Sequence, residues 1–400
     1  MAVRVLFTDH TSSFSGAEVA MMRLIRALPA DVEPAVACPP TGRLAEALGE
    51  QGITQFPIAG TDVSFRLHPT TTASGLATLA RSAIALRSIT RRWRADVVHA
   101  NGVRAGLLAI AAKYLGGPPV VVQVHDHLPQ TKLGRAVREV IARGADETIA
   151  VSDWTARVFN QGLRRAVART VYISFDQNRF RAEAYDRSAV RRGLSIADDA
   201  PLLGEVAQIT PWKGQIVAIE AMPGIRAAHP EAQLLLVGHI AFSGSGVRYD
   251  NAAYLDLLKR RTRELGLEAC VHFLGQRSDV PAIMTALDVL LLPSWDEPFG
   301  TVALEALAVG TIPVVGSSGG VTEYVEDGVC GQVVAPTDTA RWVEAVTELL
   351  SSEELRRAMS ERGRVVAARF TDEAYAAGCT AAYEAALRKP RPSRHARGVA

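Results

Sequence analysis

The chain has 400 residues, of which 48% are hydrophobic and 22% charged, and its formal net charge is +2. This composition is typical of a folded globular protein and excludes a disordered or collagen-like chain. A chain of this length exceeds what one hydrophobic core usually serves, so we expect two domains. The sequence enters a strand-like segment at once and contains no run near the ~20 apolar residues of a membrane span. We therefore expect neither a signal peptide nor a membrane helix.

Four scattered cysteines, Cys38, Cys270, Cys330 and Cys379, form no Cys-x-x-Cys pair. This pattern argues against a metal knuckle or a disulfide framework and favours a reducing, cytoplasmic location. The chain contains 39 arginines and only five lysines. We attribute this bias to the base composition of the gene and expect no nucleic-acid partner.

Charge is unevenly distributed along the chain. Residues 1–185 carry 22 basic and 15 acidic side chains, whereas residues 186–387 carry 17 basic and 27 acidic ones. The basic N-terminal half predicts peripheral contact with an acidic partner, such as the phospholipid surface at the inner face of the membrane. A solvated basic face would explain the same charge. Residues 388–400 are basic and rich in proline, and we expect them to be disordered.

The first part of the chain alternates between strand-like and helical segments. The strand-like segments are residues 4–7, 34–37, 96–99, 119–124 and 147–151, and the clearest helical ones are 17–28, 76–92 and 103–115. This alternation predicts a parallel sheet with helices on both faces.

A second set of short apolar runs follows at residues 202–207, 233–237, 270–273, 288–292, 311–315 and 331–334. We therefore expect an α/β protein with an N-terminal Rossmann-like domain at residues 1–178 and a C-terminal one at residues 179–370. Residues 371–387 are expected to form a final helix.

Two carboxylates, Glu297 and Glu305, stand eight positions apart in the segment EPFGTVALE. A carboxylate among alanines and leucines is costly to bury unless a partner hydrogen-bonds it, so the pair indicates a binding site. On one helical path the two would lie about 12 Å apart, a span that reaches between the two sugars of a diphosphate-linked ligand. A surface position for Glu305 and a favourable charge at a helix N-terminus for Glu297 would also account for these residues.

The loops that follow residues 288–292 and 311–315 are expected at the same edge of the second sheet. One loop contains the EPFG segment, and the other contains the SSGG turn of residues 317–320. In open parallel sheets, ligands bind at the carboxyl ends of the strands, where loop N–H groups and helix N-termini face them. The two loops therefore predict one shared site.

The EPFGTVALE segment resembles the Glu-x7-Glu motif of retaining glycosyltransferases of family 4, which have the GT-B fold. The resemblance extends from about residue 4 to about residue 387 and is more specific in the C-terminal half. It implies two Rossmann-like, doubly wound parallel-sheet domains that face an inter-domain cleft. It also implies that the helix at residues 371–387 crosses back onto the N-terminal domain.

The same resemblance implies roles for individual residues. Glu297 would contact the transferred sugar, and Glu305 would bind the ribose hydroxyls of the nucleotide. The backbone N–H groups of Phe299, Gly300 and Thr301 would line the sugar and the diphosphate.

The segment VAQITPWKG, residues 206–214, resembles the loop of this family in which an arginine and a lysine clamp the donor diphosphate. Lys213 matches the lysine, but Gln208 stands at the arginine position and brings no charge. We therefore expect Lys213 to stabilise most of the charge of the leaving group. By the same resemblance, Gln276 and Arg277 are expected near the nucleotide base.

Polar residues and glycine also follow strands of the N-terminal domain. Gly16 lies in a segment that resembles the Gly-Gly-Ala-Glu loop of the family, with Ser15 in place of the first glycine, although a plain loop would look the same. His125 matches the histidine that the family places near the transferred sugar. Asn101 and Ser152, also at strand ends, are expected on the acceptor side.

The His-Asp-His segment at residues 125–127 raises the question of a metal site. We expect His127 to be structural and expect no metal, because no further cluster of His, Cys or carboxylate residues supplies the missing ligands. The chain also lacks the Asp-x-Asp triplet that holds the metal in glycosyltransferases of the other common fold. Lys213, backbone N–H groups and helix dipoles would stabilise the leaving group instead, without a cofactor.

These residues predict a retaining, metal-independent glycosyltransferase of the hexosyltransferase class. It would move a sugar from a nucleotide-diphosphate donor to a hydroxyl of a glycan, a lipid-linked saccharide or a small natural product. The catalytic candidates are Lys213, Glu297 and His125. The alternatives are a sugar-nucleotide epimerase or phosphorylase of the same fold, or a catalytically silent nucleotide-binding protein, which Gln208 would suit.

Overall fold

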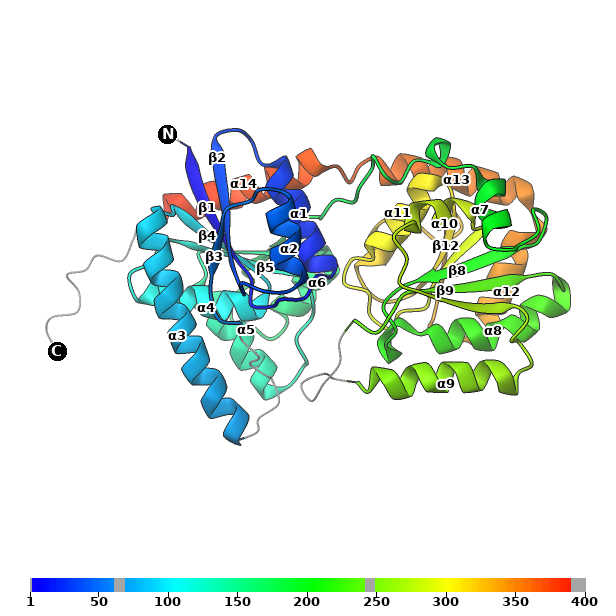
Figure 1. Ribbon diagram of the computed structural model, residues 1–400, viewed down its shortest axis with the longest axis horizontal. Coiled ribbons are helices and arrows are strands. Elements are labelled where there is room, and N and C mark those ends of the chain that lie inside the picture. Colours follow the sequence, from blue (N-terminus) through cyan, green and yellow to red (C-terminus); the bar gives the residue numbers. More distant parts are fainter. Residues whose placement is uncertain (1, 61–68, 242–248, 390–400) are drawn as a thin grey trace, which may run out of the picture. The chain divides into compact units, whose positions relative to one another are not determined.

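A computed structural model describes residues 2–60, 69–241 and 249–389 (Figure 1). The chain divides into two compact units, one made of Met1–Ile173 and Asp372–Ala400, the other of Ser174–Thr371. Each unit contains one parallel sheet wound with helices, so the predicted fold class of two Rossmann-like domains is confirmed. The expected disordered tail lies outside the described residues from residue 390 onward.

The N-terminal unit has a seven-stranded parallel sheet with the order β3-β2-β1-β4-β5-β6-β7. Its strands are β1 (Val3–Thr8), β2 (Val32–Cys38), β3 (Gln55–Pro57), β4 (Val97–Asn101), β5 (Val120–Val124), β6 (Glu147–Ala150) and β7 (Ala168–Thr170). The chain winds from β1 outward to β3, then returns to place β4 on the other side of β1 and winds outward again to β7. The direction of winding therefore reverses between β1 and β4.

Helices cover both faces of this sheet. They are α1 (Gly16–Ala27), α2 (Arg43–Glu50), α3 (Pro69–Trp93), α4 (Val103–Tyr114), α5 (Lys132–Gly144), α6 (Asp153–Asn160) and α14 (Asp372–Arg388). Figure 1 shows α1 and α14 on one side of the sheet and α3, α4 and α5 on the other. Side chains alternate along the strands, so Val98 and Val122 enter the core beneath α4 while their neighbours face α14.

The face toward α14 is held by buried polar groups. His99 on β4 bonds through Nδ1 to the Tyr383 hydroxyl at 2.8 Å and through Nε2 to Gln123 Oε1 at 3.0 Å. The Gln123 amide donates to the Tyr375 hydroxyl at 2.8 Å. Burial lowers the pKa of His99 to about 3, so its ring is neutral. Because these groups satisfy one another, the last helix belongs to the N-terminal unit.

The C-terminal unit has a six-stranded parallel sheet with the order β10-β9-β8-β11-β12-β13. Its strands are β8 (Leu202–Val206), β9 (Gln233–Val237), β10 (Val271–Gly275), β11 (Val289–Leu292), β12 (Ile312–Gly316) and β13 (Gln332–Val334). Its helices are α7 (Arg187–Gly193), α8 (Gln215–Ala228), α9 (Asn251–Glu264), α10 (Val280–Ala286), α11 (Thr301–Val309), α12 (Thr339–Ser351) and α13 (Glu353–Ala367). Short 3-10 turns are η1 (Ala182–Ala184), η2 (Pro211–Lys213) and η3 (Gly320–Glu323). Here the winding reverses between β8 and β11.

Every strand predicted from the apolar runs is present, with ends shifted by a few residues. The structure adds the short outer strands β3 and β7, which the sequence analysis did not predict. Each has only three residues, of which two are half-buried and one is exposed, so neither shows the apolar run of a strand buried on both faces. All four cysteines are buried free thiols.

The network beneath α14 predicts a specific cost for removing one hydroxyl. Tyr383→Phe leaves the Nδ1 atom of His99 without its partner in a buried position, and we expect the free energy of unfolding to fall by about 1–3 kcal/mol. Urea denaturation would measure this change. Tyr114→Phe is the control, because Tyr114 is 59% exposed and its loss should change stability by less than about 0.5 kcal/mol. Equal effects of the two substitutions would contradict the assignment.

Candidate functional site

The reversal of winding determines where each sheet can bind a ligand. Loops on the two sides of a reversal leave the sheet in opposite directions, so the carboxyl ends of the strands there border an open crevice. In the C-terminal unit this position lies between β8 and β11, and β12 is the next strand outward. The loops after these strands contain most of the predicted donor residues.

Lys213 is positioned by the loop after β8. The 3-10 turn Pro211–Lys213 ends at Gly214, whose φ of +80° favours glycine. A Cβ atom on Gly214 would lie 2.2 Å from the carbonyl oxygen of Pro293, so the loop passes directly against the end of β11. This approach brings Lys213 Nζ within 2.6 Å of Glu297 Oε2, and the two side chains are only 12% and 8% exposed.

Glu297 is fixed by side-chain and backbone contacts. The Ser294 hydroxyl donates to Glu297 Oε2 at 2.8 Å. The backbone of Glu297 pairs with the SSGG turn, where Gly320 N donates to the Glu297 carbonyl at 2.7 Å. A Cβ atom on Gly319 would lie 2.1 Å from the same carbonyl oxygen, so only glycine allows this approach. The two loops therefore meet, as predicted.

The assumption of one helical path from Glu297 to Glu305 is wrong. Helix α11 begins at Thr301, and Glu297 lies before it in an extended bridge with Gly319. Gly300 is the N-cap, with a φ of +82° that marks the change of direction. The motif therefore crosses from a loop into a helix, and the separation of about 12 Å does not follow.

Three of the motif residues lie around the start of α11. Phe299 is 3% exposed and packs against Tyr324, with ring centroids 5.5 Å apart, so its side chain is core. The Tyr324 hydroxyl donates to the Gly300 carbonyl at 2.6 Å and holds the turn. Thr301 opens the helix, and Glu305 is half-buried on it.

The remaining predicted donor residues occupy less enclosed positions. Gln208 is half-buried after β8, and its carbonyl accepts from the Gln215 side chain at 2.9 Å. Gln276 and Arg277 follow β10 and are exposed. Arg277 pairs with Asp279 at 2.7 Å. In the sheet order, β10 lies two strands from β8, so these two residues lie farther from the reversal than Lys213 does.

A buried carboxyl group that was not predicted from the sequence lies close to this ion pair. Glu205 on β8 is 1% exposed, and among the residues that the structure describes neither of its carboxyl oxygens has a hydrogen-bond partner. Burial raises the pKa of Glu205 well above 4.5, with Lys213 acting against this shift and Glu297 adding to it. Because the charges of Lys213 and Glu297 both act on the Glu205 carboxyl group, Glu205 lies near this ion pair. The pattern of β8 offered a signal, since a glutamate interrupts the apolar strand LLGEV.

Two tryptophans also escaped the sequence analysis. Lys213 Nζ lies 4.1 Å from the centre of the Trp212 ring. The backbone N–H of Trp295 donates to the Trp212 carbonyl at 2.9 Å, and the Trp295 side chain is 53% exposed. An exposed aromatic ring beside a charged site offers a flat apolar surface to a ligand.

The N-terminal unit has its own set of polar groups at the reversal of winding, near the carboxyl ends of β1 and β4. Gly16 begins α1, and an added Cβ atom there would meet nothing within 4 Å. Glu18 Oε2 accepts from the backbone N–H and the hydroxyl of Ser15 at 2.7 and 2.6 Å. Burial, with the charge of Asp9 as the second cause, raises the pKa of Glu18 to about 6. Asp9 itself is completely buried.

His125 and Asn101 are brought together, whereas Ser152 has a different environment. His125 Nε2 lies 2.8 Å from Asn101 Oδ1 at the carboxyl ends of β5 and β4. Ser152 is completely buried and caps α6, with its Oγ accepting from Thr155 N at 3.0 Å. His127 packs edge-on against Trp154, with ring centroids 5.6 Å apart.

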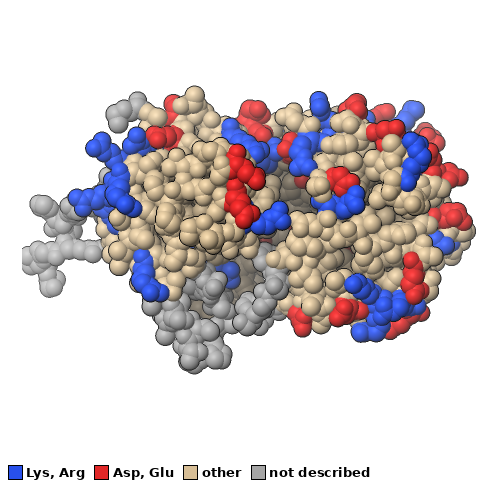
Figure 2. All heavy atoms as spheres, viewed as in Figure 1, with Lys and Arg blue, Asp and Glu red and all other residues tan. Residues whose placement is uncertain are grey.

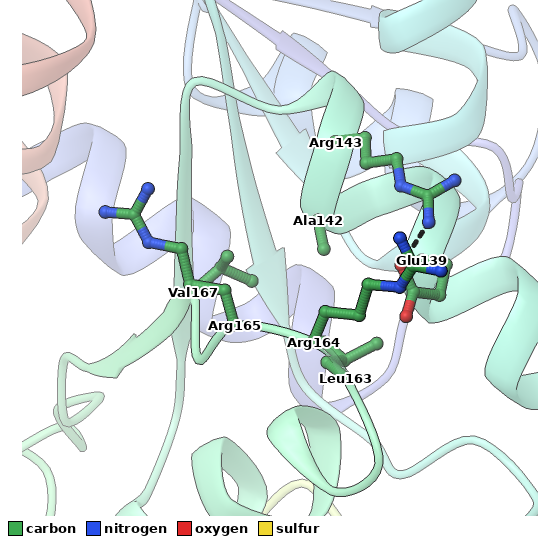
Figure 3. A pocket seen from close by; sticks show the side chains of 7 residues that line it. All are labelled: Glu139, Ala142, Arg143, Leu163, Arg164, Arg165 and Val167. Carbon is green, nitrogen blue, oxygen red and sulfur yellow. Dashed lines mark ion pairs between the residues drawn. The ribbon is translucent and has the colours of Figure 1, made fainter.

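A pocket of about 490 Å³ lies elsewhere in the N-terminal unit (Figure 3). Its lining comes from α5 and from the segment between α6 and β7, namely Glu139, Ala142, Arg143, Leu163, Arg164, Arg165 and Val167. Figure 3 shows Arg164 beside the Arg143–Glu139 ion pair, while Arg165 points away. No predicted site residue lines it. Within residues 2–60, 69–241 and 249–389, no group of three His, Cys, Asp or Glu side chains could hold a metal ion.

Two parallel-sheet units, each with polar groups at its reversal of winding, define the GT-B class of two-domain proteins. The family model described as Glycosyltransferase Family 4 matches residues 14–179, and that described as Glycosyl transferases group 1 matches residues 186–366. The chain belongs to glycosyltransferase family 4.

Relatives and solved structures agree with this assignment. The D-inositol 3-phosphate glycosyltransferase of Stackebrandtia nassauensis is 31% identical over 294 residues, which cover 69% of this chain and 65% of that protein. The chain thus spans just under two thirds of this relative. The enzyme of the same name from Mycobacterium tuberculosis is 28% identical over 390 residues, covering 91% of this chain and 76% of that protein. Anabaena Alr3699/HepE in complex with UDP and glucose has the same fold, with a TM-score of 0.80, 23% identity and coverage of 96% and 99%.

The unpartnered carboxyl group of Glu205 predicts a pH-dependent difference in stability. Because its pKa is raised in the folded chain, the stability it contributes is complete below about pH 4.5 and is lost as the pH rises toward the folded pKa. Glu205→Gln cannot ionise and does not lose this stability. Relative to the wild type, its free energy of unfolding should therefore rise by up to about 1.4 kcal/mol per pH unit in that range. Urea denaturation at about pH 5 and about pH 8 would measure the gain. The exposed control Glu348→Gln should show no such trend, and a gain that shrinks with pH would contradict the assignment.

Proposed function

We propose that this protein is a retaining glycosyltransferase that moves a sugar from a nucleotide-diphosphate donor to a hydroxyl group of an acceptor. The observation that carries the proposal is the buried Lys213–Glu297 pair at the reversal between β8 and β11. It combines a cation for a leaving diphosphate with a carboxylate for sugar hydroxyls, in a family of glycosyltransferases. The activity in the names of the relatives agrees with it.

Departure of a nucleoside diphosphate requires positive charge near its phosphates. Lys213 supplies this charge in the proposal, and the N–H groups at the start of α11 add the positive end of a helix dipole. Gln208 offers hydrogen bonds without charge. Lys213 therefore has to stabilise more of the negative charge of the leaving diphosphate than it would beside an arginine. We propose on this basis that the reaction needs no metal ion.

Retention of configuration is proposed to follow from attack on the same face of the sugar. The Oε2 atom of Glu297 already accepts from Lys213 at 2.6 Å and from Ser294 at 2.8 Å. A carboxylate oxygen engaged in this way is a weak nucleophile, which favours an orienting role for Glu297 over a covalent one. The leaving phosphate would then take the proton of the acceptor hydroxyl.

The acceptor is proposed to bind the N-terminal unit, on the side of Asn101 and Ser152, whereas Gly16 and His125 are proposed to contact the donor. A glycan, a lipid-linked saccharide and a small natural product are the candidate acceptor classes. Because two relatives are named for D-inositol 3-phosphate, this compound belongs in the first acceptor screen. HepE was solved with UDP and glucose, so UDP-sugars are the first donors to test.

The two halves of the donor site should respond differently to substitution. Lys213→Ala should lower kcat by about 10²–10³-fold, because the lost charge acts on the leaving group. Glu305→Ala should raise the donor KM by at least about tenfold, the cost of one charged hydrogen bond, with a smaller change in kcat. Release of the nucleoside diphosphate in the presence of donor and acceptor would measure both constants.

Several controls separate the alternatives. Glu348→Ala, at an exposed position of α12, should leave both constants unchanged. Addition of EDTA should not lower the rate if the reaction needs no metal ion. Nucleotide release without an acceptor would favour an epimerase or phosphorylase, and binding without turnover on any acceptor would favour a silent protein. Full activity of Lys213→Ala would remove the proposed role of that residue.

A second element of the proposal is peripheral contact with an anionic membrane through a basic surface of the N-terminal unit. This basic surface consists of Arg135, Arg143, Arg164 and Arg165, which are exposed on α5 and the neighbouring loop. Figure 3 shows the last three. Arg143, Arg164 and Arg165 line the same pocket, and Gly162 in the same loop lies against Arg135.

Acidic side chains offset only part of the basic charge here, since Glu139 pairs with Arg143 at 2.9 Å. Residues 131–170 contain eight basic and four acidic side chains. Each of the four acidic side chains has a partner in its own unit: Glu139, Asp146, Glu147 and Asp153. In the C-terminal unit, by contrast, Figure 2 shows many acidic side chains along the outer edge of the visible face. In the part of the chain that the structure describes, no helix is long and apolar enough to cross a bilayer.

Charge reversal on the basic surface should abolish binding to anionic vesicles. Each arginine near such a surface contributes about 1 kcal/mol, so Arg164→Glu with Arg165→Glu should weaken binding by at least about 30-fold. Sedimentation with phosphatidylcholine vesicles, with and without phosphatidylglycerol, would measure this effect. Arg357→Glu with Arg362→Glu, at exposed positions of α13, is the matched control and should bind as the wild type does. Equal binding to neutral vesicles, or no effect of the first pair, would contradict the proposal.

A further inference from the structure

Three side chains form a chain of hydrogen bonds at the reversal of winding in the N-terminal unit. Asn101 Nδ2 donates to Asp9 Oδ2 at 2.7 Å, and Asn101 Oδ1 lies 2.8 Å from His125 Nε2. Asp9 is completely buried and Asn101 is 3% exposed, so solvent does not replace these contacts. The residues follow three adjacent strands, β1, β4 and β5.

The direction of each hydrogen bond in this chain is determined by Asp9. Both carboxyl oxygens of Asp9 accept hydrogen bonds, Oδ1 from Thr11 N at 3.1 Å and Oδ2 from Asn101 Nδ2 at 2.7 Å. Asn101 must therefore turn its NH2 group toward Asp9 and its carbonyl oxygen toward His125. A carbonyl oxygen only accepts, so the Nε2 atom of His125 must carry the proton.

The ring of His125 is neutral as well as oriented. Burial lowers its pKa to about 4, and the charge of Asp9 opposes this shift without reversing it. The neighbouring imidazole of His99 is also neutral. A neutral imidazole with its proton on Nε2 has a lone pair on Nδ1, so that atom is an acceptor.

We propose that Asp9 and Asn101 are positioning residues that hold His125 as the neutral Nε2–H tautomer and make its Nδ1 atom an acceptor for a ligand hydroxyl. This inference deepens the proposed function and rests on it for the nature of the ligand, a sugar hydroxyl. His125 then contributes no positive charge to the departure of a diphosphate. Its role is recognition of a hydroxyl group, and the charge at the reaction must come from elsewhere.

The tautomer can be measured without any assumption about activity. Protonated and unprotonated ring nitrogens of histidine differ strongly in 15N chemical shift, and the protein has nine histidines to resolve by selective labelling. His125→Gln assigns the signal. We expect the wild type at neutral pH to show a proton on Nε2 and none on Nδ1 of His125. A proton on Nδ1, or on both nitrogens, would overturn the proposal whether or not the protein transfers sugars.

Asp9→Asn tests the origin of the tautomer. Because an asparagine at position 9 can donate as well as accept, the Asn101 amide loses its fixed orientation, and the Nδ1–H form should become populated. Asp31→Asn, at an exposed site of the same unit, is the matched control and should leave the His125 signals unchanged. If Asp9→Asn does not fold, the wild-type spectrum alone decides the tautomer. An unchanged tautomer in folded Asp9→Asn would overturn the role of Asp9.

Two substitutions of His125 test which ring nitrogen meets the ligand. The side-chain amide of asparagine keeps a polar group near the Nδ1 position, whereas that of glutamine keeps one near Nε2. We expect His125→Asn to retain at least about tenfold more kcat/KM than His125→Gln, the scale of a misplaced contact. The reverse order would contradict recognition through Nδ1. Failure of the proposed function would instead appear as no turnover by the wild type, with the Nε2–H tautomer intact.

Discussion

The ion pair between Lys213 and Glu297 is the interaction on which the C-terminal site depends. Both side chains are almost completely buried, where an isolated charge would cost several kcal/mol, so each requires the other until a ligand replaces it. A diphosphate offers Lys213 an anion, and sugar hydroxyls offer Glu297 hydrogen-bond donors. A ligand with both groups satisfies both residues, whereas a bare nucleoside diphosphate would leave Glu297 without its cation. The pair thus couples recognition of the two ends of one molecule.

Much of the fold could be predicted because parallel strands covered on both faces are short, continuous apolar runs. Val289–Leu292 and Val120–Val124 are completely or almost completely buried, and both were predicted although the second run contains the polar Gln123. The edge strands β3 and β7 escaped prediction because each has only three residues and is partly exposed, so neither shows a continuous apolar run. The packing of α14 on the N-terminal unit was expected only from the family resemblance, since Tyr383 meets His99 across 284 positions of the chain. No local pattern indicates such a partner.

In the candidate site, too, residues with a recognisable sequence pattern could be predicted, whereas residues that matter through a tertiary contact could not. Glu297 and the turn at residues 317–320 were found from loops at strand ends, and Lys213 was found from the resemblance of its loop to the family. The structure brings Lys213 and the turn against Glu297. The helical path from Glu297 failed because the Glu297 backbone pairs with Gly319 and because Gly300, with a φ of +82°, begins α11 only after it. Ser294 and Asp9 were missed, since each matters through one contact that only the folded sheet creates.

The order of segments along the chain has a consequence for synthesis. The C-terminal unit is one continuous segment, Ser174–Thr371, inserted between two segments of the N-terminal unit. A ribosome therefore completes the second unit before it releases α14. Until then, His99 and Gln123 lack the tyrosines that satisfy them, and unpaired polar groups oppose burial of that face of the sheet. The N-terminal unit is thus the first to be synthesised in part and the last to be completed. A chain truncated before α14 would expose an incomplete N-terminal sheet to cellular proteases, although its C-terminal unit is complete.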